Sequence, residues 1–203
     1  MSIRLLVATT NPGKVREFNE ALASESIEVV GLETLSTELD VEETGSTFEA
    51  NARIKAEAYS LETTDWVVAD DSGIEVDALD GAPGVHSARY GGDGLDNKGR
   101  NRALVLALKE VVDPAQRTGR FRCVLAVARQ GKTLAIFPGA VEGRILDAEQ
   151  GEGGFGYDPL FYYPPFGCTL AEVPLEKKRS VSHRGQAIAK LIAALRSGEL
   201  ALD

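Results

Sequence analysis

Residues 3–14 read IRLLVATTNPGK, an apolar run that passes directly into turn chemistry. The run of branched side chains at 3–9 predicts a strand buried on both faces, as in parallel sheets. The Asn-Pro-Gly that follows predicts a turn, and Val15, Phe18 and Leu22 then recur at helical spacing. A buried strand that leads into a helix in this way favours an α/β fold.

The remaining chain alternates predicted strands with predicted helices. Strands are expected at 27–30, 66–69 with a resumption at 74–79, 121–128, 133–137 and 160–163. Helices are expected at 46–62, capped by Ser46 or Thr47, and at 97–112 and 185–197. The short connection near 131–132 predicts an antiparallel pair. The sequence therefore predicts one α/β domain over residues 1–203, with helices flanking a mixed sheet.

The composition is that of a folded, acidic protein. Apolar residues make up 43% and charged residues 26%, and 31 acidic against 22 basic side chains give a net charge of −9. This charge disfavours binding to a nucleic-acid polymer, which requires a basic face. No run approaches the ~18 apolar residues of a membrane helix, and the start does not resemble a secretory leader. Cys123 and Cys168 form no zinc or disulfide pattern, so we expect a cytoplasmic protein without membrane contact.

The first candidate site is the turn after the first strand. It carries Thr9, Thr10, Asn11, Pro12, Gly13 and Lys14. Glycine permits close approach of a ligand to the backbone, the amides at a helix start suit phosphate oxygens, and lysine adds a cation. The alternative is a plain strand–turn–helix connection with a solvated lysine.

The second candidate site is Asp70-Asp71-Ser72-Gly73, which follows a buried strand. Ligands of open α/β sheets bind at the ends of core strands. Because successive side chains of a strand alternate between faces, we expect one aspartate to face the ligand and the other to serve the scaffold. Such a carboxylate can hold a hard divalent cation or take a proton from water. A local turn is the alternative.

An acidic cluster precedes the helix predicted at 46–62, and it consists of Glu38, Asp40, Glu42 and Glu43. One of its carboxylates could complete a magnesium site with an aspartate. A solvated charge run, favourable near a helix start, is the alternative.

Two further segments carry aromatic and basic side chains. In the glycine-rich loop at 153–159, Phe155 or Tyr157 could stack on a planar base, while a tight turn anchoring Phe155 in the core is the alternative. The basic run at 177–185 ends just before the last predicted helix. Because lysine and arginine only donate hydrogen bonds, Lys178 or Arg184 would favour a 6-keto purine over adenine. The alternative is a solvated basic face.

These motifs, in this order, resemble the inosine triphosphate pyrophosphatase (Ham1-type) family. The likeness runs through TTNPGK, EETGSTFEANARIKA, ADDSGIEVDALDGAPGVHSARYGG, GGFGYDPLF and SVSHRGQA, and it covers most of the chain. It implies an elongated, bent mixed sheet with helices in two lobes and a nucleotide between them. It also implies a magnesium-dependent homodimer that hydrolyses ITP, dITP and XTP to the monophosphate and pyrophosphate, which cleanses the nucleotide pool.

The resemblance also assigns roles to individual residues. It implies that Asp71 is the catalytic proton acceptor and, with Glu42, a magnesium ligand. The residues that it implies for substrate binding are Thr9, Thr10, Asn11, Pro12, Gly13, Lys14, Lys55, Ser72, Phe155, Gly156, Tyr157, Asp158, Lys178, His183 and Arg184. Asn51 lies beside Lys55 on the same predicted helix.

The chain departs from the family pattern at one position. The family has an acidic residue before the Asn-Ala of its helix, and this chain has Ala50 there. Two other functions stay open on the residues alone. One is a pyrophosphatase for modified pyrimidine nucleotides of the Maf type, and the other is a nucleotide-binding module without turnover.

Overall fold

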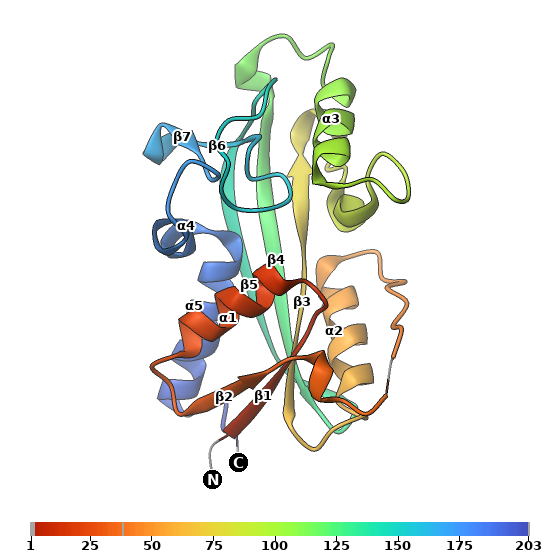
Figure 1. Cartoon of the computed structure of the whole chain (residues 1–203), viewed down its shortest axis with the longest axis vertical. Helices are drawn as coiled ribbons and strands as arrows, with labels where there is room; N and C mark the ends of the chain where they lie inside the picture. The colour runs from red at the N-terminus through yellow and green to blue at the C-terminus, as the bar shows by residue number, and fades with distance from the viewer. Residues whose placement is uncertain (1–2, 38, 203) are drawn as a thin grey trace. The chain divides into compact units, whose positions relative to one another are not determined.

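The computed structural model describes residues 3–37 and 39–202, so Glu38 lies outside the described residues. The strands are β1 (Ile3–Ala8), β2 (Ile27–Val30), β3 (Trp66–Val76), β4 (Thr118–Arg129), β5 (Lys132–Ile145), β6 (Phe161–Tyr163) and β7 (Cys168–Thr169) (Figure 1). The α-helices are α1 (Pro12–Leu22), α2 (Phe48–Tyr59), α3 (Asn97–Ala107), α4 (Leu175–Val181) and α5 (His183–Ser197). None of the described helices is long and apolar enough to cross a membrane.

The strands form one seven-stranded sheet in the order β2-β1-β3-β4-β5-β6-β7. β1 pairs in parallel with β2 and β3, whereas β6 pairs antiparallel with β5 and β7. β4 and β5 are joined by Gln130 and Gly131, which both have positive φ (53° and 77°), and a connection this short joins antiparallel strands. The predicted α/β class with a mixed sheet and flanking helices is therefore confirmed.

The chain divides into two compact units. Unit 1 comprises residues 1–71, 123–139 and 184–203, and unit 2 comprises residues 72–122 and 140–183. Because each unit draws on separate stretches of sequence, each is held together by contacts between residues that are distant along the chain.

In unit 1, α1 and α5 cover one face of the sheet and α2 lies on the other (Figure 1). Phe18 and Leu22 of α1 and Ile188 of α5 pack in one buried cluster with Leu5 and Val68 of the strands. The first strand is buried from Leu5 to Ala8, as its continuous apolar run predicts. α2 begins after Thr47, whose side-chain oxygen accepts from the amide of Ala50 at 3.1 Å and so confirms one of the two predicted caps.

Unit 2 has a core of its own. Ile74 and Val76 of β3, Leu104 of α3, Phe121 of β4 and Phe161 of β6 belong to its buried cluster. Phe121 and Phe161 make a tilted ring contact with centroids 4.5 Å apart. Burial of apolar surface of this kind is the main favourable term in folding.

Several elements differ from the sequence expectations, including β5, which runs to Ile145 and not to 137. β3 is continuous from Trp66 to Val76, whereas strands were expected at 66–69 and 74–79 with a local turn as one alternative between them; contacts within the protein compensate the carboxylates there. α3 ends at Ala107 and not at 112, since the chain tightens into i+3 turns from Lys109 onward. The basic segment, for which no helix was predicted, contains part of the short helix α4, which a pattern without a clear apolar stripe did not indicate.

Candidate active site

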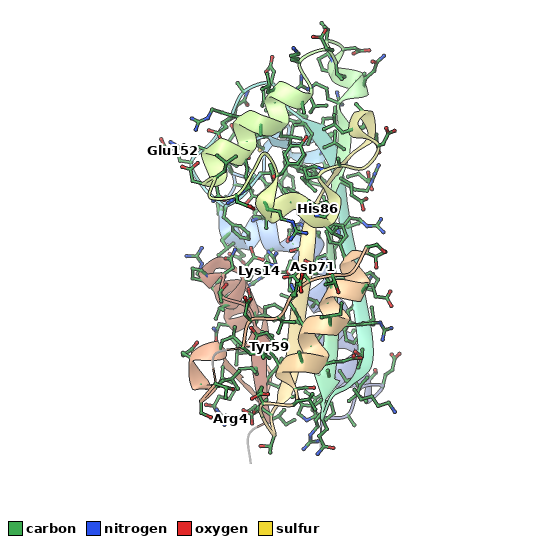
Figure 2. All side chains as sticks on the ribbon, turned by 90° about the vertical axis from the view of Figure 1, so that its right-hand side faces the viewer. Arg4, Lys14, Tyr59, Asp71, His86 and Glu152 are labelled. Carbon is green, nitrogen blue, oxygen red and sulfur yellow. The ribbon has the colours of Figure 1, made fainter. Side chains whose placement is uncertain are left out.

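Asp70 and Asp71 occupy consecutive positions of β3, so their side chains leave opposite faces of the sheet. Val68 shares its face with Asp70 and packs in the cluster formed with α1 and α5. Asp70 therefore faces α1 and α5, whereas Asp71 faces α2. Figure 2 shows Asp71 and Lys14 at the same end of unit 1, with Arg4 at the start of β1 toward the opposite end.

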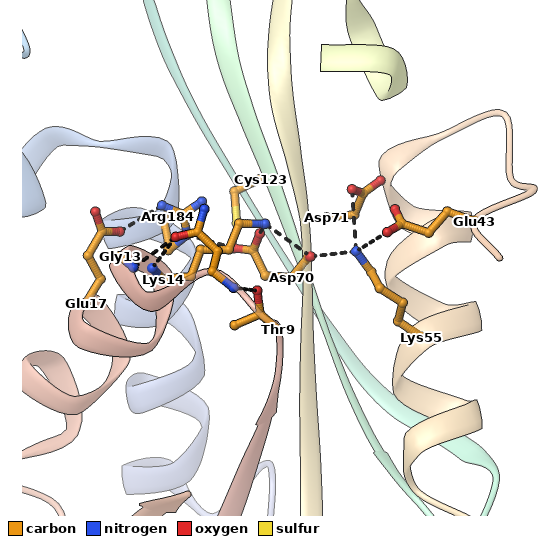
Figure 3. Close-up of polar contacts among 11 residues, drawn as sticks. Thr9, Gly13, Lys14, Glu17, Glu43, Lys55, Asp70, Asp71, Cys123 and Arg184 are labelled. Atoms are coloured by element: carbon orange, nitrogen blue, oxygen red, sulfur yellow. Dashed lines mark hydrogen bonds and ion pairs between the residues drawn. The ribbon is translucent and has the colours of Figure 1, made fainter. Parts of the chain in front are cut away.

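The Asp70 carboxylate lies at the centre of a buried group of polar side chains (Figure 3). The Lys14 ammonium contacts its Oδ1, and Arg184 Nε and Cys123 Sγ approach its Oδ2 at 2.8 and 3.1 Å. Burial raises the pKa of the Asp70 carboxyl, but the charges of Arg184 and Lys14 outweigh this effect and hold the pKa well below its usual range. Asp70 is therefore ionised at neutral pH.

Arg184 is buried in unit 1 and pairs with two carboxylates. Its side chain is 2% exposed, and its Nη1 donates to Oε2 of Glu17 on α1 at 2.8 Å in addition to the bond to Asp70. Burial lowers the pKa of the guanidinium, while Asp70 and Glu17 raise it by more, so the arginine stays charged. The structure brings Arg184 to the same carboxylate as Lys14, while the expectation that Arg184 reads a purine remains a prediction.

On the other face of β3, Lys55 lies between acidic groups. Its Nζ is 2.9 Å from the main-chain oxygen of Asp70, 3.1 Å from Glu43 Oε1 and 3.7 Å from Asp71 Oδ1. Burial raises the pKa of the Asp71 carboxyl to about 6, and Lys55 lowers this pKa while Glu43 raises it. Asp71 is thus a stronger base than an aspartate in water.

Asn51 connects the acidic loop to Asp71. Its side chain is buried, its Oδ1 accepts from the amide of Gly45 at 2.7 Å, and it hydrogen-bonds to the Asp71 carboxyl. Asn51 therefore fixes both the carboxyl of Asp71 and the backbone next to Glu43.

The turn at the start of α1 is held by its own side chains. Asn11 Oδ1 accepts from the amides of Gly13 at 2.9 Å and Lys14 at 3.3 Å, and Thr9 Oγ1 accepts from the amide of Asn11. The amides expected to be available to phosphate are thus in part capped by Asn11. A pocket of about 650 Å³ borders this turn, with Thr9, Thr10 and Pro12 in its wall.

In unit 2, the glycine-rich loop and α4 form a second cluster. Lys178 Nζ donates to Asp158 Oδ2 at 2.7 Å, and the amide of Phe155 donates to the same oxygen at 2.8 Å. The Lys178 ammonium also lies 4.5 Å from the centre of the Phe155 ring. A cation, a carboxylate and a half-buried aromatic ring therefore occupy one small region.

The other residues of this loop have structural contacts. Tyr157 is buried, its hydroxyl donates to the main-chain oxygen of Ser87 at 2.8 Å, and burial raises its pKa to about 12. The main-chain oxygen of Gly156 accepts from Asn101 Nδ2 at 3.2 Å. Of the two aromatic rings considered for stacking on a base, the structure therefore leaves Phe155 as the more accessible one.

His183 and Ser72 also belong to unit 2. His183 is 5% exposed and stacks on the Phe121 ring with centroids 4.8 Å apart. Ser72 directly follows Asp71 on β3 and is half-buried. Their expected substrate contacts remain predictions.

Within unit 1, the structure brings together Lys14, Lys55, Asp71 and Arg184, while Glu42 is exposed and its neighbour Glu43 contacts Lys55. The sequence reasoning did not consider Glu17 or Asn101, and it did not anticipate the central place of Asp70. Glu43 and Asn51 were both considered, but their contacts with Lys55 and Asp71 were not predicted. Spacing alone cannot distinguish Glu42 from Glu43, because both fit the same acidic run. Glu17 pairs with a residue 167 positions away, for which the sequence holds no local signal.

The residues around Asp71 fit a magnesium ion by their chemistry. Among the described residues, no group of three or more His, Cys, Asp or Glu side chains is placed to hold a metal. Magnesium is nevertheless commonly bound by one or two carboxylates together with substrate phosphates. Asp71 and Glu43 supply two carboxylates around a position where the Lys55 ammonium already lies, so this position accepts positive charge.

Two curated proteins similar to this chain carry the same description. The "dITP/XTP pyrophosphatase" of Listeria monocytogenes serotype 4b (strain F2365) is 48% identical over 188 residues, which are 93% of this chain and 92% of the relative. The protein of the same description from Geobacillus kaustophilus (strain HTA426) is 50% identical over 187 residues, 92% of this chain and 91% of the relative.

Solved structures and a family model agree with these relatives. A HAM1 protein from Coxiella burnetii superimposes with a TM-score of 0.88 at 37% identity, over 96% of this chain and 99% of that one. The model described as the Ham1 family matches residues 5–194. The chain therefore belongs to the Ham1 family.

Proposed function

We propose that this chain hydrolyses deaminated purine nucleoside triphosphates (ITP, dITP and XTP) to the monophosphate and pyrophosphate. The relatives described as dITP/XTP pyrophosphatases match more than nine tenths of it. The observation that carries the proposal is the arrangement in unit 1, where Asp71 and Glu43 share the Lys55 ammonium beside the turn that holds Lys14.

The cations of unit 1 bind the triphosphate in this proposal. Lys14 and Lys55 lie within 3.5 Å of the same main-chain oxygen, that of Asp70, so both can approach one anionic group. The turn of Thr9, Thr10, Asn11, Pro12 and Gly13 binds phosphate oxygens next to Lys14 in this proposal. Its residues Thr9, Thr10 and Pro12 also line the adjoining pocket, which Lys14, Lys55 and Asp71 do not line. Positive groups fixed in this way stabilise the charge that develops on a leaving pyrophosphate.

Asp71 acts as the proton acceptor. In the metal-free site its pKa of about 6 leaves it ionised at neutral pH, so that it can accept a proton or a hydrogen bond from an attacking water. We propose that Asp71 and a glutamate of the 42–43 pair hold magnesium. The ion supplies charge neutralisation at phosphate oxygens and a lower pKa for bound water.

Unit 2 supplies recognition of the base. Phe155 offers a ring face for stacking, and Lys178, fixed by Asp158, offers a donor that a 6-keto purine satisfies and adenine does not. Ser72, Gly156, Tyr157, His183 and Arg184 are further proposed substrate contacts, carried by the family resemblance. The free thiols of Cys123 and Cys168 support a cytoplasmic location, and the resemblance supports a homodimer.

A substrate panel tests this function. Purified protein is incubated with ITP, dITP, XTP, GTP, ATP and a modified dUTP, with magnesium or with excess EDTA, and the products are identified. We expect monophosphate and pyrophosphate from ITP, dITP and XTP in magnesium only. Orthophosphate as the product, a preference for the modified pyrimidine, or tight binding without turnover would each contradict the proposal.

Removal of the Phe155 ring is expected to weaken substrate binding. Base–aromatic stacking contributes ~1–3 kcal/mol, so Phe155→Ala should raise the KM for ITP by roughly 5- to 100-fold with a smaller change in kcat. Phe166→Ala is the matched control, because Lys177 lies 4.3 Å from the Phe166 ring in the same way. Equal effects of the two variants on KM would argue against stacking at Phe155.

A further inference from the structure

Three basic side chains from three helices converge on one residue of β3. Lys14 of α1 contacts Oδ1 of Asp70, and Arg184 of α5 donates to its Oδ2 at 2.8 Å (Figure 3). Lys55 of α2 donates to the main-chain oxygen of Asp70 at 2.9 Å. Asp70 itself has a side chain that is 0% exposed, so it is far less accessible than the lysines around it.

Lys14 needs a fixed anionic partner to keep its ammonium in place, because of where it lies on α1. Lys14 lies in the first turn of α1, where the helix carries its partial positive charge, and no acidic residue is present in that turn. A cation at this end of a helix is disfavoured, and the Arg184 guanidinium adds a second positive charge nearby. Without a carboxylate at position 70, the Lys14 side chain would lower its free energy by turning its ammonium toward solvent, where it is hydrated and free to move.

The carboxylate of Asp70 is held in turn by a connected series of charged side chains. Arg184 donates from Nε to Asp70 and from Nη1 to Glu17 at 2.8 Å each. Glu17 lies on α1 one turn after Lys14, so the series Lys14–Asp70–Arg184–Glu17 begins and ends on the same helix. The series contains two positive and two negative groups, which compensate one another inside the protein.

We propose that Asp70 is a positioning residue that holds the Lys14 ammonium where it receives the polyphosphate of the ligand. Asp70 does not touch the ligand in this proposal. Glu17 and Arg184, the latter in addition to its proposed substrate contact, keep the Asp70 carboxylate in place. The proposal rests on the proposed function, in that the ligand is a nucleoside triphosphate. A positioning role is incompatible with the opposite role, in which the Asp70 carboxylate competes with phosphate for Lys14.

Asp70→Asn tests the proposal, because asparagine has nearly the same shape but no charge. Binding is measured by calorimetry with three probes: inorganic tripolyphosphate, the α,β-methylene analogue of ITP, and IMP. We expect the variant to bind tripolyphosphate and the analogue ~10- to 100-fold more weakly than wild type. Its affinity for IMP should change by less than about threefold. A merely structural defect would weaken the binding of IMP as well. Tighter binding of tripolyphosphate by the variant would show that the Asp70 carboxylate competes with phosphate for Lys14. Either result overturns the proposal.

A double-mutant cycle shows whether Asp70 acts through Lys14. In a Lys14→Ala background, Asp70→Asn should cause no further loss of tripolyphosphate affinity, whereas independent roles would give additive losses and overturn the proposal. Glu25→Gln is the control, since Glu25 pairs with Arg196 of α5 and does not belong to the series Lys14–Asp70–Arg184–Glu17. Its loss should leave the binding of tripolyphosphate unchanged. Glu17→Gln, which keeps Asp70 and Lys14, should lower the affinity for tripolyphosphate several-fold. This variant tests the positioning role if Asp70→Asn does not fold, and an unchanged affinity would then overturn the proposal.

Failure of the proposed function gives a different result. In that case the wild-type protein does not hydrolyse ITP, and the tripolyphosphate comparison still decides the role of Asp70. If instead the wild-type protein hydrolyses ITP and Asp70→Asn binds tripolyphosphate as tightly as wild type, only the present inference is wrong.

Discussion

Asp71→Asn is expected to reduce the turnover of ITP by roughly a thousandfold or more while the protein remains folded. The substitution removes the proton acceptor and one of the two carboxylates proposed for magnesium, but it keeps the shape of the side chain and its contact with Asn51. Steady-state pyrophosphate release in magnesium measures the loss, and circular dichroism confirms the fold. Near-normal turnover would rule out both roles of Asp71.

The same variant is expected to be more stable than wild type in EDTA at neutral pH. Burial raises the pKa of Asp71 from 3.8 to about 6, so the folded state favours the protonated carboxyl and loses stability as the pH rises through this interval. Asparagine never ionises, so the gain should be near zero at pH 4 and reach on the order of 2 kcal/mol above pH 7. Urea unfolding at several pH values measures it.

Asp77→Asn, at the residue that directly follows β3, is the control, because the pKa of Asp77 is shifted in the opposite direction. The hydrogen bond from Thr118, together with Arg120, lowers the pKa of Asp77 by more than burial raises it, so its ionised form is favoured in the folded state. Loss of this charge should give no gain in stability at neutral pH and should leave turnover unchanged. A gain for Asp77→Asn equal to that of Asp71→Asn would contradict the account based on burial.

Arg184→Met is expected to lower the free energy of unfolding by about 3–5 kcal/mol, the usual effect of removing one partner of a buried ion pair. The variant leaves Asp70 and Glu17 buried without the guanidinium that bonds to both. Arg196→Met is the matched control on the same helix, because Arg196 is 64% exposed where it pairs with Glu25 and surface pairs contribute ~0–1 kcal/mol. Urea denaturation compares the two variants.

A second substitution separates lost charge from lost packing at Arg184. Glu17→Met added to Arg184→Met removes one of the carboxylates left behind, so the double variant should be more stable than Arg184→Met alone. If Arg184→Met costs no more than Arg196→Met, the buried charges are not coupled as the distances indicate.

The fold was predictable where a local pattern determines it. Three features are each set by neighbouring residues and lie at or within one residue of their predicted places. They are the strand predicted at 3–9 and found at Ile3–Ala8, the cap at Thr47, one of the two predicted, and the connection predicted near 131–132 and found at 130–131. At 70–73 the sequence left a local turn open as an alternative, because polar residues and glycine are typical of turns when read alone. β3 continues there because Arg184, from the far end of the chain, compensates Asp70.

The site was predictable to a similar extent. The alternation of a strand was enough to predict that Asp70 and Asp71 serve different faces, one of them the scaffold. It was not enough to find Glu17 or to choose Glu43 over Glu42 as the neighbour of Lys55, since both depend on where the chain returns in space. Of the base-recognition residues that the resemblance implies, residues 155–158, Lys178 and His183 lie in unit 2 and Arg184 lies in unit 1, and their roles remain predictions.

The division of the chain bears on how the protein can be dissected. The backbone passes from one unit to the other between residues 71 and 72, 122 and 123, 139 and 140, and 183 and 184. A truncated clone that ends at any single position therefore never yields one unit whole and by itself. Fragments from deletion mapping therefore lack part of one core or carry part of the other, and a unit can be assayed by itself only if its separate segments are joined by added linkers.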